Sequence, residues 1–443
     1  EMITDAVWDY VLKGIGSAEA VHTATGLPVD IAKQMRAEFD YWYPVDLRVS
    51  AKDLIQNHLT MFLYNHAAIW PEDRSRWPQS IYCNGHIQVD NEKMSKSKGN
   101  FISVQDALEL YGADATRLAC ADAGDSLDDA NFVRETAAGF IMKLTTLIDA
   151  AKEAVSKLDS FRSDSNLNVF DKIFDNAINA AILQTEAYYS GMAYRMALNT
   201  AFFELTNEFS QYKVCCDDQL MHRDLVLRYY ETMALLLMPI APHFAEHMWL
   251  DVLPGHSTSI MRQPFPKPSA PVSYSTQVAS RVFNDVVKEI RSQVTKNAKK
   301  KGVIDELFVY AAKDFNEWQK AALRTLRQVY EANNNTFPAD TAKIIIAKKE
   351  SWMTPALMQE AMAFIAFVKL NSEKYGAEAL ADVPVINDME ILNQVLPTIC
   401  KLSGVPKINV LDRDDESIPE HKIARGKARP SEPVVTFPPA PKK

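Results

Sequence analysis

The chain has 443 residues, of which 47% are hydrophobic and 24% charged, and this composition excludes a disordered or fibrous protein. It has neither an apolar run of about 18 residues, as a membrane span needs, nor a basic stretch followed by an apolar core, as a secretion signal needs, so we expect a cytoplasmic protein without a membrane partner. The net charge of −9 argues against indiscriminate coating of nucleic acid, and five cysteines without a C-x-x-C pair argue against a disulfide framework or a zinc ribbon.

Residues 1–111 combine helical and strand patterns. The spacing of apolar residues predicts a helix over Leu54–Ala68, while strand-like segments are predicted over Val45–Val49 and Ile81–Val89. This part of the chain is therefore predicted to be an α/β domain.

In residues 112–265, apolar residues recur at helical spacing almost throughout. The pattern predicts helices over Ala137–Ala151, Tyr194–Val214 and Leu225–Met238, and Pro239 then interrupts it. Several helices in succession predict an α-helical bundle.

A connector rich in proline and serine, Pro264–Ser275, precedes residues 276–424, for which we predict a small α/β module. The module should begin with a long helix that ends in a basic turn over Lys296–Gly302. The other expected elements are strands over Leu307–Ala311 and Ile408–Leu411 and helices over Asn316–Ala332 and Leu357–Leu370. Residues 425–443 are rich in Pro and Lys with little to bury, so they are predicted to form an extended tail.

One run of residues carries the chemistry: Lys93-Met94-Ser95-Lys96-Ser97-Lys98-Gly99-Asn100. It follows the strand predicted to end at Val89 and precedes a helix that Ser103 and Asp106 can cap. Two lysines three residues apart on a strand-to-helix turn can bring two ammonium groups onto one polyphosphate. Such a pair suits the attack of a carboxylate on the α-phosphorus of ATP, because negative charge gathers on the departing pyrophosphate.

A solvated basic loop is the alternative interpretation of this run. The full five-residue match, its strand-to-helix setting and the following Gly99-Asn100 favour a resemblance to the KMSKS loop of class I aminoacyl-tRNA synthetases. The resemblance implies that Lys93 and Lys96 are catalytic and that Lys93, Met94, Ser95 and Lys96 bind ATP.

An upstream stretch, Ser50 to His58, resembles the G-K-D-x-x-x-x-H segment of the same class. The resemblance implies that Asp53 accepts hydrogen bonds from the ATP ribose and that His58 lies near the nucleotide. Ala51 stands where the family has glycine, which would permit a positive φ or a close approach of the ligand. A helix N-cap at Asp53 and a half-buried core position for His58 are the structural alternatives.

The two motifs are shared by the methionine, isoleucine, valine and leucine enzymes, but the flanking segments are similar to the cytosolic leucyl-tRNA synthetases of eukaryotes and archaea. The similarity extends over nearly the whole chain. The segments that carry it are Val7–Tyr10, Phe39–Ser50, Asn57–Leu59, Leu63–His66, Asn84–His86, Ala121–Asp125, Asp129–Phe132, Met221–Arg223, Pro242–His243, Glu246–Trp249 and Tyr330–Asn334.

That family's amino-terminal half and its inserted editing domain have no counterpart in these 443 residues, and none of the nine histidines begins a His-x-Gly-His motif. The resemblance therefore implies the second half of a Rossmann-type catalytic domain over residues 1–111. A stem-contact and anticodon-binding helical domain would follow over 112–265, and a tRNA-interacting α/β module over 276–424. We expect a fragment that cannot form leucyl-adenylate alone.

The activity implied for the whole enzyme is the ATP-dependent activation of leucine and its transfer to tRNA-Leu, with Mg²⁺ accompanying ATP and no tightly bound metal. Other synthetases or scaffold proteins are possible partners. Three alternatives stay open: another enzyme of the same subclass, a non-catalytic tRNA- or protein-binding module, and one subunit of a split synthetase.

Two further patterns bear on binding. The lysines Lys296, Lys299, Lys300 and Lys301 are candidate contacts to tRNA phosphates, with a solvated loop as the alternative. His243-Phe244-Ala245-Glu246-His247 matches the H-x-x-E-H pattern of zinc peptidases, but the preceding Pro242 and the apolar residues that follow favour a capped helix of the bundle.

Overall fold

The computed structural model describes residues 2–95, 97, 99–301, 304–348, 352–355 and 357–438, apart from the side chains of 217–219 and 297–301. The chain divides into two compact units. Unit 1 consists of residues 1–149, 187–199 and 237–245, and unit 2 consists of residues 150–186, 200–236 and 246–443. In the described part of the chain, no helix is both long enough and apolar enough to cross a membrane.

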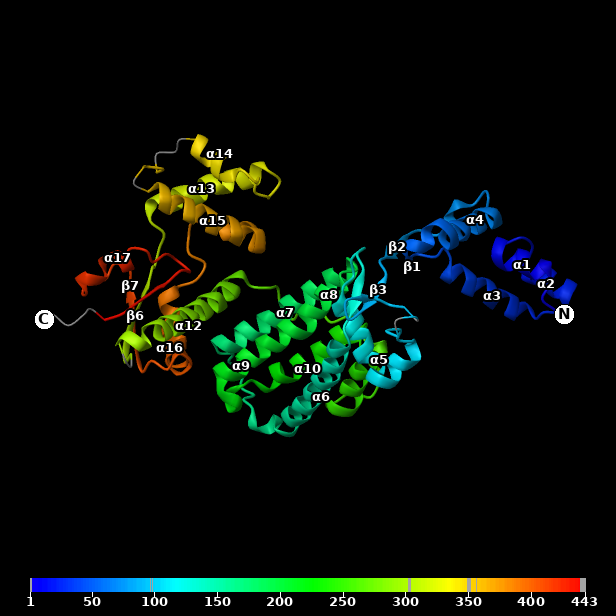
Figure 1. The fold of residues 1–443 in the computed structure, drawn as a ribbon, viewed down its shortest axis with the longest axis horizontal. Helices are drawn as coiled ribbons and strands as arrows, with labels where there is room; N and C mark the ends of the chain where they lie inside the picture. The colour runs from blue at the N-terminus through cyan, green and yellow to red at the C-terminus, as the bar shows by residue number, and fades with distance from the viewer. Residues whose placement is uncertain are drawn as a thin grey trace. The chain divides into compact units, whose positions relative to one another are not determined.

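Helices make up most of both units, and the strands form three small sheets (Figure 1). The α-helices are α1 Asp5–Trp8, α2 Ala18–Thr25, α3 Val29–Trp42, α4 Thr60–Ile69, α5 Val104–Ala123, α6 Arg134–Ser156, α7 Val169–Ser190, α8 Tyr194–Leu198, α9 Leu205–Leu220, α10 Arg223–Leu237, α11 Pro242–His247, α12 Tyr274–Lys301, α13 Glu317–Ala332, α14 Thr341–Ala347, α15 Met358–Tyr375, α16 Asp388–Ser403 and α17 Lys422–Arg425. The strands are β1 Arg48–Ala51, β2 Ile81–Asn84, β3 Ile87–Val89, β4 Glu92–Lys93, β5 Ala130–Phe132, β6 Glu306–Ala311, β7 Lys407–Asp412 and β8 Val434–Thr436.

Unit 1 begins with three helices around a small apolar core. Ser17 caps α2 by accepting a hydrogen bond from the Ala20 backbone N–H, and Gly26 ends the helix at φ 76°. Along each helix the core residues recur at helical spacing, so they lie on one face, as in amphipathic helices. They are Val7, Val11, Ala18, Val21, Leu27 and Ala32.

Two separate sheets follow in unit 1. β1 and β2 pair in parallel, with Ser50 opposite Cys83, while β3 lies between antiparallel β4 and parallel β5. The prediction of one continuous strand over Ile81–Val89 was therefore wrong. The strand breaks at Gly85-His86 because the backbone of Asp128 lies against Gly85, and the Asp129 carboxylate binds the His86 N–H instead of a neighbouring strand.

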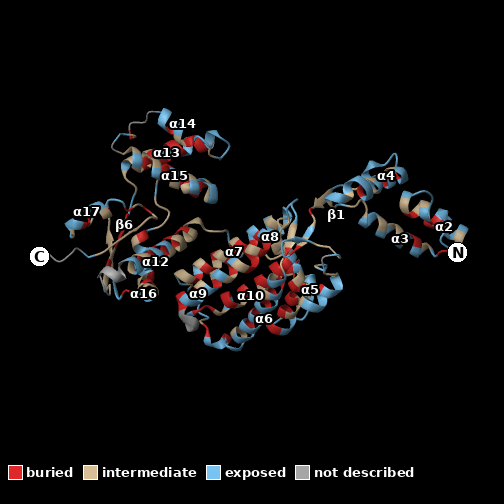
Figure 2. Ribbon diagram, viewed as in Figure 1, coloured by how far each residue is buried: buried red, intermediate tan, exposed pale blue. Residues whose placement is uncertain are grey.

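The helices of the bundle in unit 2 pack through aromatic side chains. Phe174 of α7 stacks on Tyr212 of α9 with ring centroids 4.6 Å apart, and Phe209 stacks on Tyr229 of α10 at 4.0 Å. Buried residues are concentrated along these three helices, as Figure 2 shows. The predicted helix over Tyr194–Val214 is confirmed as α8, a π-helical stretch Asn199–Glu204 and α9.

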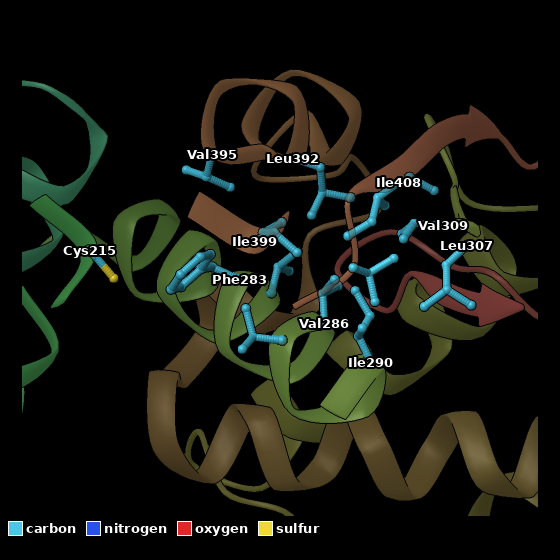
Figure 3. Packing of buried hydrophobic residues seen from close by; sticks show 14 of the residues in the cluster. Cys215, Phe283, Val286, Ile290, Leu307, Val309, Leu392, Val395, Ile399 and Ile408 are labelled. Atoms are coloured by element: carbon cyan, nitrogen blue, oxygen red, sulfur yellow. The ribbon is translucent and has the colours of Figure 1, made fainter. Parts of the chain in front are cut away.

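The predicted C-terminal α/β module contains a three-stranded sheet in the order β7-β6-β8. Phe283, Val286 and Ile290 of α12 point toward β6 and α16 and form one apolar core with them (Figure 3). α12 continues to Lys301, so the prediction of a basic turn over Lys296–Gly302 was wrong for Lys296 to Lys301. Lysine and alanine favour helix, and this run has no glycine before Gly302, which lies outside the described residues.

Residues 425–443 were predicted to be an extended tail with little to bury, and this was wrong for residues 425–438, which pack on the sheet. β8 pairs antiparallel with β6, and Ala428 is buried. His421 connects β6 with the residue after β8, because its Nδ1 lies 2.9 Å from the Tyr310 hydroxyl and its Nε2 lies 2.7 Å from the Phe437 carbonyl oxygen. Val434, Val435 and Thr436 are all β-branched and favour a strand, although prolines lie on both sides of them. Residues 439–443 lie outside the described residues.

A helical subdomain is inserted between β6 and α16. α13, α14 and α15 enclose an apolar core of their own, which is distinct from the core of the sheet. The buried residues of this second core are Ala322, Leu323, Leu326, Tyr330, Ile345, Trp352, Ala361, Phe364, Ile365, Val368 and Leu380.

Candidate functional site

The candidate site lies where β1 and β2 end. Because the two strands are parallel, their carboxyl ends meet at one edge of the sheet, which is where open α/β sheets bind ligands. Lys52 and Asp53 follow β1 directly, and Gly85 and His86 follow β2. The fold therefore brings together two charged segments that lie more than thirty residues apart in sequence.

Asp129 connects these two segments. One oxygen of its carboxylate, Oδ1, accepts a hydrogen bond from Lys52 Nζ at 2.7 Å and another from the His86 backbone N–H at 2.9 Å. The Lys52 ammonium group, followed by the His86 N–H, holds the pKa of Asp129 below its usual range. Asp129 is therefore a carboxylate at neutral pH and cross-links the ends of the two strands.

The His86 ring lies between two carboxylates. Its Nε2 is 3.7 Å from Asp53 Oδ2, and its Nδ1 is 3.7 Å from Asp129 Oδ1. The side chain of Asp53 is 56% exposed, so its carboxylate can accept hydrogen bonds from a ligand hydroxyl group.

Gly85 is required by the close approach of the Asp128 backbone. A Cβ atom built on Gly85 would lie 2.3 Å from the Asp128 carbonyl oxygen and 2.6 Å from the Asp129 amide nitrogen. Backbone atoms cannot move aside as the end of a flexible side chain can, so any larger residue displaces the segment that carries Asp129.

We predict that Gly85→Ala destabilises the protein by about 1–3 kcal/mol, the usual cost of overpacking. The urea midpoint of unfolding measures this change. Gly139→Ala is the matched control, because Gly139 lies inside α6 and its nearest neighbour is the flexible tip of Lys143 at 3.5 Å. There, alanine should stabilise by about 0.5–1 kcal/mol. Equal effects at the two positions would contradict the proposed steric role of Gly85.

His58 lies on the helical segment that leaves β1. A 3₁₀ turn over Lys52–Leu54, a π-helical stretch over Ile55–Leu59 and α4 together confirm the predicted helix in this region. Arg48 Nη2 lies 3.1 Å from His58 Nε2, and because arginine can only donate, the ring nitrogen is the acceptor. His58 is exposed, which does not fit a half-buried core position.

Ala51 is the last residue of β1, with φ −113° and ψ 152°. This is ordinary extended backbone that alanine adopts without strain. The substitution of alanine for the glycine of the family is therefore compatible with the local backbone.

Lys93 is exposed and is the last residue of β4. Its Cα is paired with that of Gln88 across the hairpin, and Gln88 follows His86 by two residues. One short strand therefore connects the lysine of the KMSKS run with the Asp53–His86 pair. Met94 and Ser95 are half-buried, and Lys96 lies outside the described residues.

The helix predicted after the KMSKS run is confirmed as α5. Ser103 is its N-cap: the Ser103 hydroxyl accepts from the Asp106 N–H, and the Asp106 carboxylate accepts from the Ser103 N–H. The Ser103 hydroxyl, followed by the Ser103 N–H, holds the pKa of Asp106 below its usual range. This capping box fixes the point at which the loop ends.

A cavity of about 670 Å³ in unit 1 adjoins the same two strands. Leu47 and Val49 line it from the β1 side and Tyr82 and Asn84 from β2, together with residues of α5. The guanidinium group of Arg117 is fixed beside it, because Nε donates to the Ile240 carbonyl oxygen at 2.7 Å. This size suits a small organic ligand.

The H-x-x-E-H residues have other partners. His243 Nδ1 lies 3.0 Å from Asp114 Oδ1, and Glu246 Oε2 accepts from the Ile260 N–H at 2.8 Å. His247 lies 2.8 Å from Asp251. Within the described ranges, no group of three or more His, Cys, Asp or Glu side chains is arranged to hold a metal ion.

Lys52, His86 and Asp129 were not predicted as site residues. The only signal available was that His86 and Asp129 lie in segments similar to the synthetase family, and a polar residue after a strand is too common to identify a site. Lys299, Lys300 and Lys301 are helical in the backbone, and Lys296 is exposed on the same helix, α12.

Models of known families match three segments of the chain. Residues 23–152 match the model described as tRNA synthetases class I (M), and residues 171–309 match the anticodon-binding domain of tRNA ligase. Residues 311–383 match the leucine–tRNA ligase RagD-binding domain. These matches identify a class I aminoacyl-tRNA synthetase segment followed by an anticodon-binding domain.

Individual relatives show which family of class I synthetases the chain belongs to. The cytoplasmic leucine–tRNA ligase of Pongo abelii is 38% identical over a stretch that covers 86% of this chain and 32% of that protein. The cytoplasmic leucine–tRNA ligase of Dictyostelium discoideum is 36% identical over 99% of this chain and 41% of that protein. The chain belongs to the leucine–tRNA ligase family, and it spans about a third to two fifths of the length of these relatives. A crystal structure of an Agrobacterium radiobacter K84 LeuRS ternary complex overlaps 51% of this chain and 29% of that chain, with 18% identity and a TM-score of 0.44.

Proposed function

We propose that this chain forms part of an enzyme that activates leucine with ATP and transfers it to tRNA-Leu in the cytoplasm. One structural observation carries the proposal: Lys93 is paired with Gln88, two residues after His86, and His86 lies 3.7 Å from Asp53. A lysine suited to polyphosphate and a carboxylate suited to a ribose are thereby connected by one hairpin at the carboxyl edge of a parallel sheet.

In the proposed reaction, a carboxylate oxygen of leucine attacks the α-phosphorus of ATP. The bond from the α-phosphorus to the bridging oxygen breaks, and pyrophosphate leaves with the electron pair. Asp53 would bind the ribose hydroxyl groups, with His58 near the nucleotide. The ammonium groups of Lys93 and Lys96 would stabilise the charge that develops on pyrophosphate, with Met94 and Ser95 shaping the loop between them.

We propose that Mg²⁺ enters this site with ATP. The ion needs few protein ligands when substrate phosphates supply most of its coordination.

ATP–pyrophosphate exchange by the full-length protein tests the assignment. We expect exchange that depends on leucine and is far weaker with isoleucine, valine or methionine. Exchange that depends on one of those three instead would favour another enzyme of the subclass. A protein that binds tRNA but exchanges with none of the four amino acids would be a non-catalytic binding module.

We further propose that residues 112–265 and 276–424 bind tRNA, and that Lys296, Lys299, Lys300 and Lys301 contact its phosphates. Lys296 is exposed on α12, and the next three lysines occupy the last turn of the same helix. Positive charge concentrated at one helix end is suited to a phosphate backbone, even in a protein with a net charge of −9.

Replacing these four lysines with glutamine should reduce the salt dependence of tRNA affinity. For every phosphate that loses its lysine, the slope of log Kd against log salt should fall by about one. Binding at several salt concentrations measures the slope. Lys13→Gln and Lys33→Gln, which lie in the first helices and outside the residues proposed to bind tRNA, remove charge elsewhere and serve as controls. An unchanged slope in the fourfold variant would exclude phosphate binding at this helix end.

We also propose a protein partner for the inserted helical subdomain. The matching family model names RagD binding, and the subdomain has a core of its own on which a binding surface can be built. Titration of purified RagD into the full-length protein tests this proposal, and no detectable binding would refute it for this chain.

A further inference from the structure

The side chain of Asn100 binds the main chain of the KMSKS run at Lys93 and Ser95. Its Oδ1 accepts a hydrogen bond from the Ser95 backbone N–H at 2.8 Å, and its Nδ2 donates to the Lys93 carbonyl oxygen at 3.2 Å. The orientation of the amide follows from the partners, because a backbone N–H can only donate and a carbonyl oxygen can only accept. Asn100 therefore binds the main chain on both sides of Met94.

Both ends of the loop are anchored. Lys93 ends β4, which is paired with β3, and the capping box of Ser103 and Asp106 fixes the start of α5. Gly99, directly before Asn100, has a φ of 70°, which is unfavourable for other residues. The two bonds of Asn100 hold the main chain at Lys93 and Ser95 beside the start of the segment that leads into α5.

We propose that Asn100 is a positioning residue that holds the main chain at Lys93 and Ser95 in the conformation used for ATP activation. This inference rests on the proposed function. The asparagine side chain combines a donor and an acceptor at the required reach, whereas aspartate retains only the acceptor and alanine retains neither. Aspartate would also place a negative charge beside the Lys93 carbonyl oxygen.

The test compares Asn100→Ala and Asn100→Asp with the wild type in the full-length protein. Gln105→Ala is the control, because Gln105 is exposed on the first turns of α5 and its side chain binds Glu109 rather than the loop. Two quantities are measured: the single-turnover rate of leucyl-adenylate formation, with KM for leucine, and the rate of tryptic cleavage after Lys93 without ATP.

We expect Asn100→Ala to slow adenylate formation by about 10- to 100-fold, as misplaced catalytic groups do, with KM for leucine unchanged. Asn100→Asp should fall between alanine and wild type, because it can still accept from the Ser95 N–H. Cleavage after Lys93 should be faster in Asn100→Ala and unchanged in Gln105→Ala. Melting temperatures equal to that of the wild type establish that the variants are folded.

A rate or a cleavage pattern for Asn100→Ala that matches Gln105→Ala overturns the inference. If the wild-type protein shows no leucine-dependent exchange, the proposed function is refuted instead, and the positioning role of Asn100 is refuted with it. The two failures are distinguishable, because normal exchange in both the wild type and Asn100→Ala contradicts only the role of Asn100.

Discussion

Lys96→Ala in the full-length protein is expected to slow leucyl-adenylate formation by about 10²- to 10³-fold, the usual cost of removing one pre-placed donor from a developing negative charge. The affinity for leucine should change little, because the Lys96 ammonium group would interact with pyrophosphate as it leaves rather than with the amino acid. Pre-steady-state measurement of adenylate formation separates the two quantities.

Lys98→Ala is the matched control for this prediction. It removes the same charge two residues further along, outside the five-residue KMSKS match. If the run were only a solvated basic loop, the two variants would behave alike. An equal loss of rate and of leucine affinity in Lys96→Ala would indicate simple binding rather than stabilisation of the transition state.

Residues 1–443 expressed alone are expected to show no leucine-dependent ATP–pyrophosphate exchange. Within the described residues, the sheet at the candidate site has two strands, β1 and β2, and parallel sheets are normally larger and covered on both faces. Val49 on β1 is 52% exposed, and Met61 and Tyr64 on α4 are 60% and 67% exposed. Lys93 would supply one side of the proposed ATP site, but residues 1–443 contain no His-x-Gly-His for the other side.

Adding the amino-terminal half of a leucine–tRNA ligase should restore exchange from an undetectable level. The same half mixed with the Lys96→Ala chain is the control and should restore far less. Robust exchange by residues 1–443 without any addition would contradict the prediction and would mean that the groups needed for chemistry all lie within this chain.

The fold was predictable where one physical signal dominated. Long helices of the bundle, such as α6 and α10, have sustained helical periodicity, and their existence and approximate positions follow from it. β6 and β7 are short apolar runs between polar turns, and they were also predicted. α16 was not, although its apolar residues Leu392, Val395 and Ile399 have helical spacing, because Pro397 within the helix resembles a helix breaker.

The site was predictable only as far as sequence-local chemistry extends. The KMSKS run predicts Lys93 and Lys96 as site residues, because five consecutive residues suffice to recognise the resemblance. Asp129 acts through contacts with Lys52 and His86, which lie 77 and 43 residues away, and these contacts exist only after β1, β2 and β5 have taken their places. The break at Gly85 was missed for the same reason, since the obstructing backbone belongs to residue 128.

The helical insertion between β6 and α16 meets α12 and the segment before β8 at a seam of polar and aromatic side chains, where the rings of Tyr274 and Tyr375 lie 4.9 Å apart. Arg281 donates to Asn371 Oδ1 across this seam, and the Arg429 guanidinium group lies 5.6 Å from the ring of Phe364. Two apolar cores that are separated by such contacts can unfold independently of each other. Because its apolar core is its own, the insertion can unfold locally without the sheet, and its sequence can change while the flanking strands keep their register.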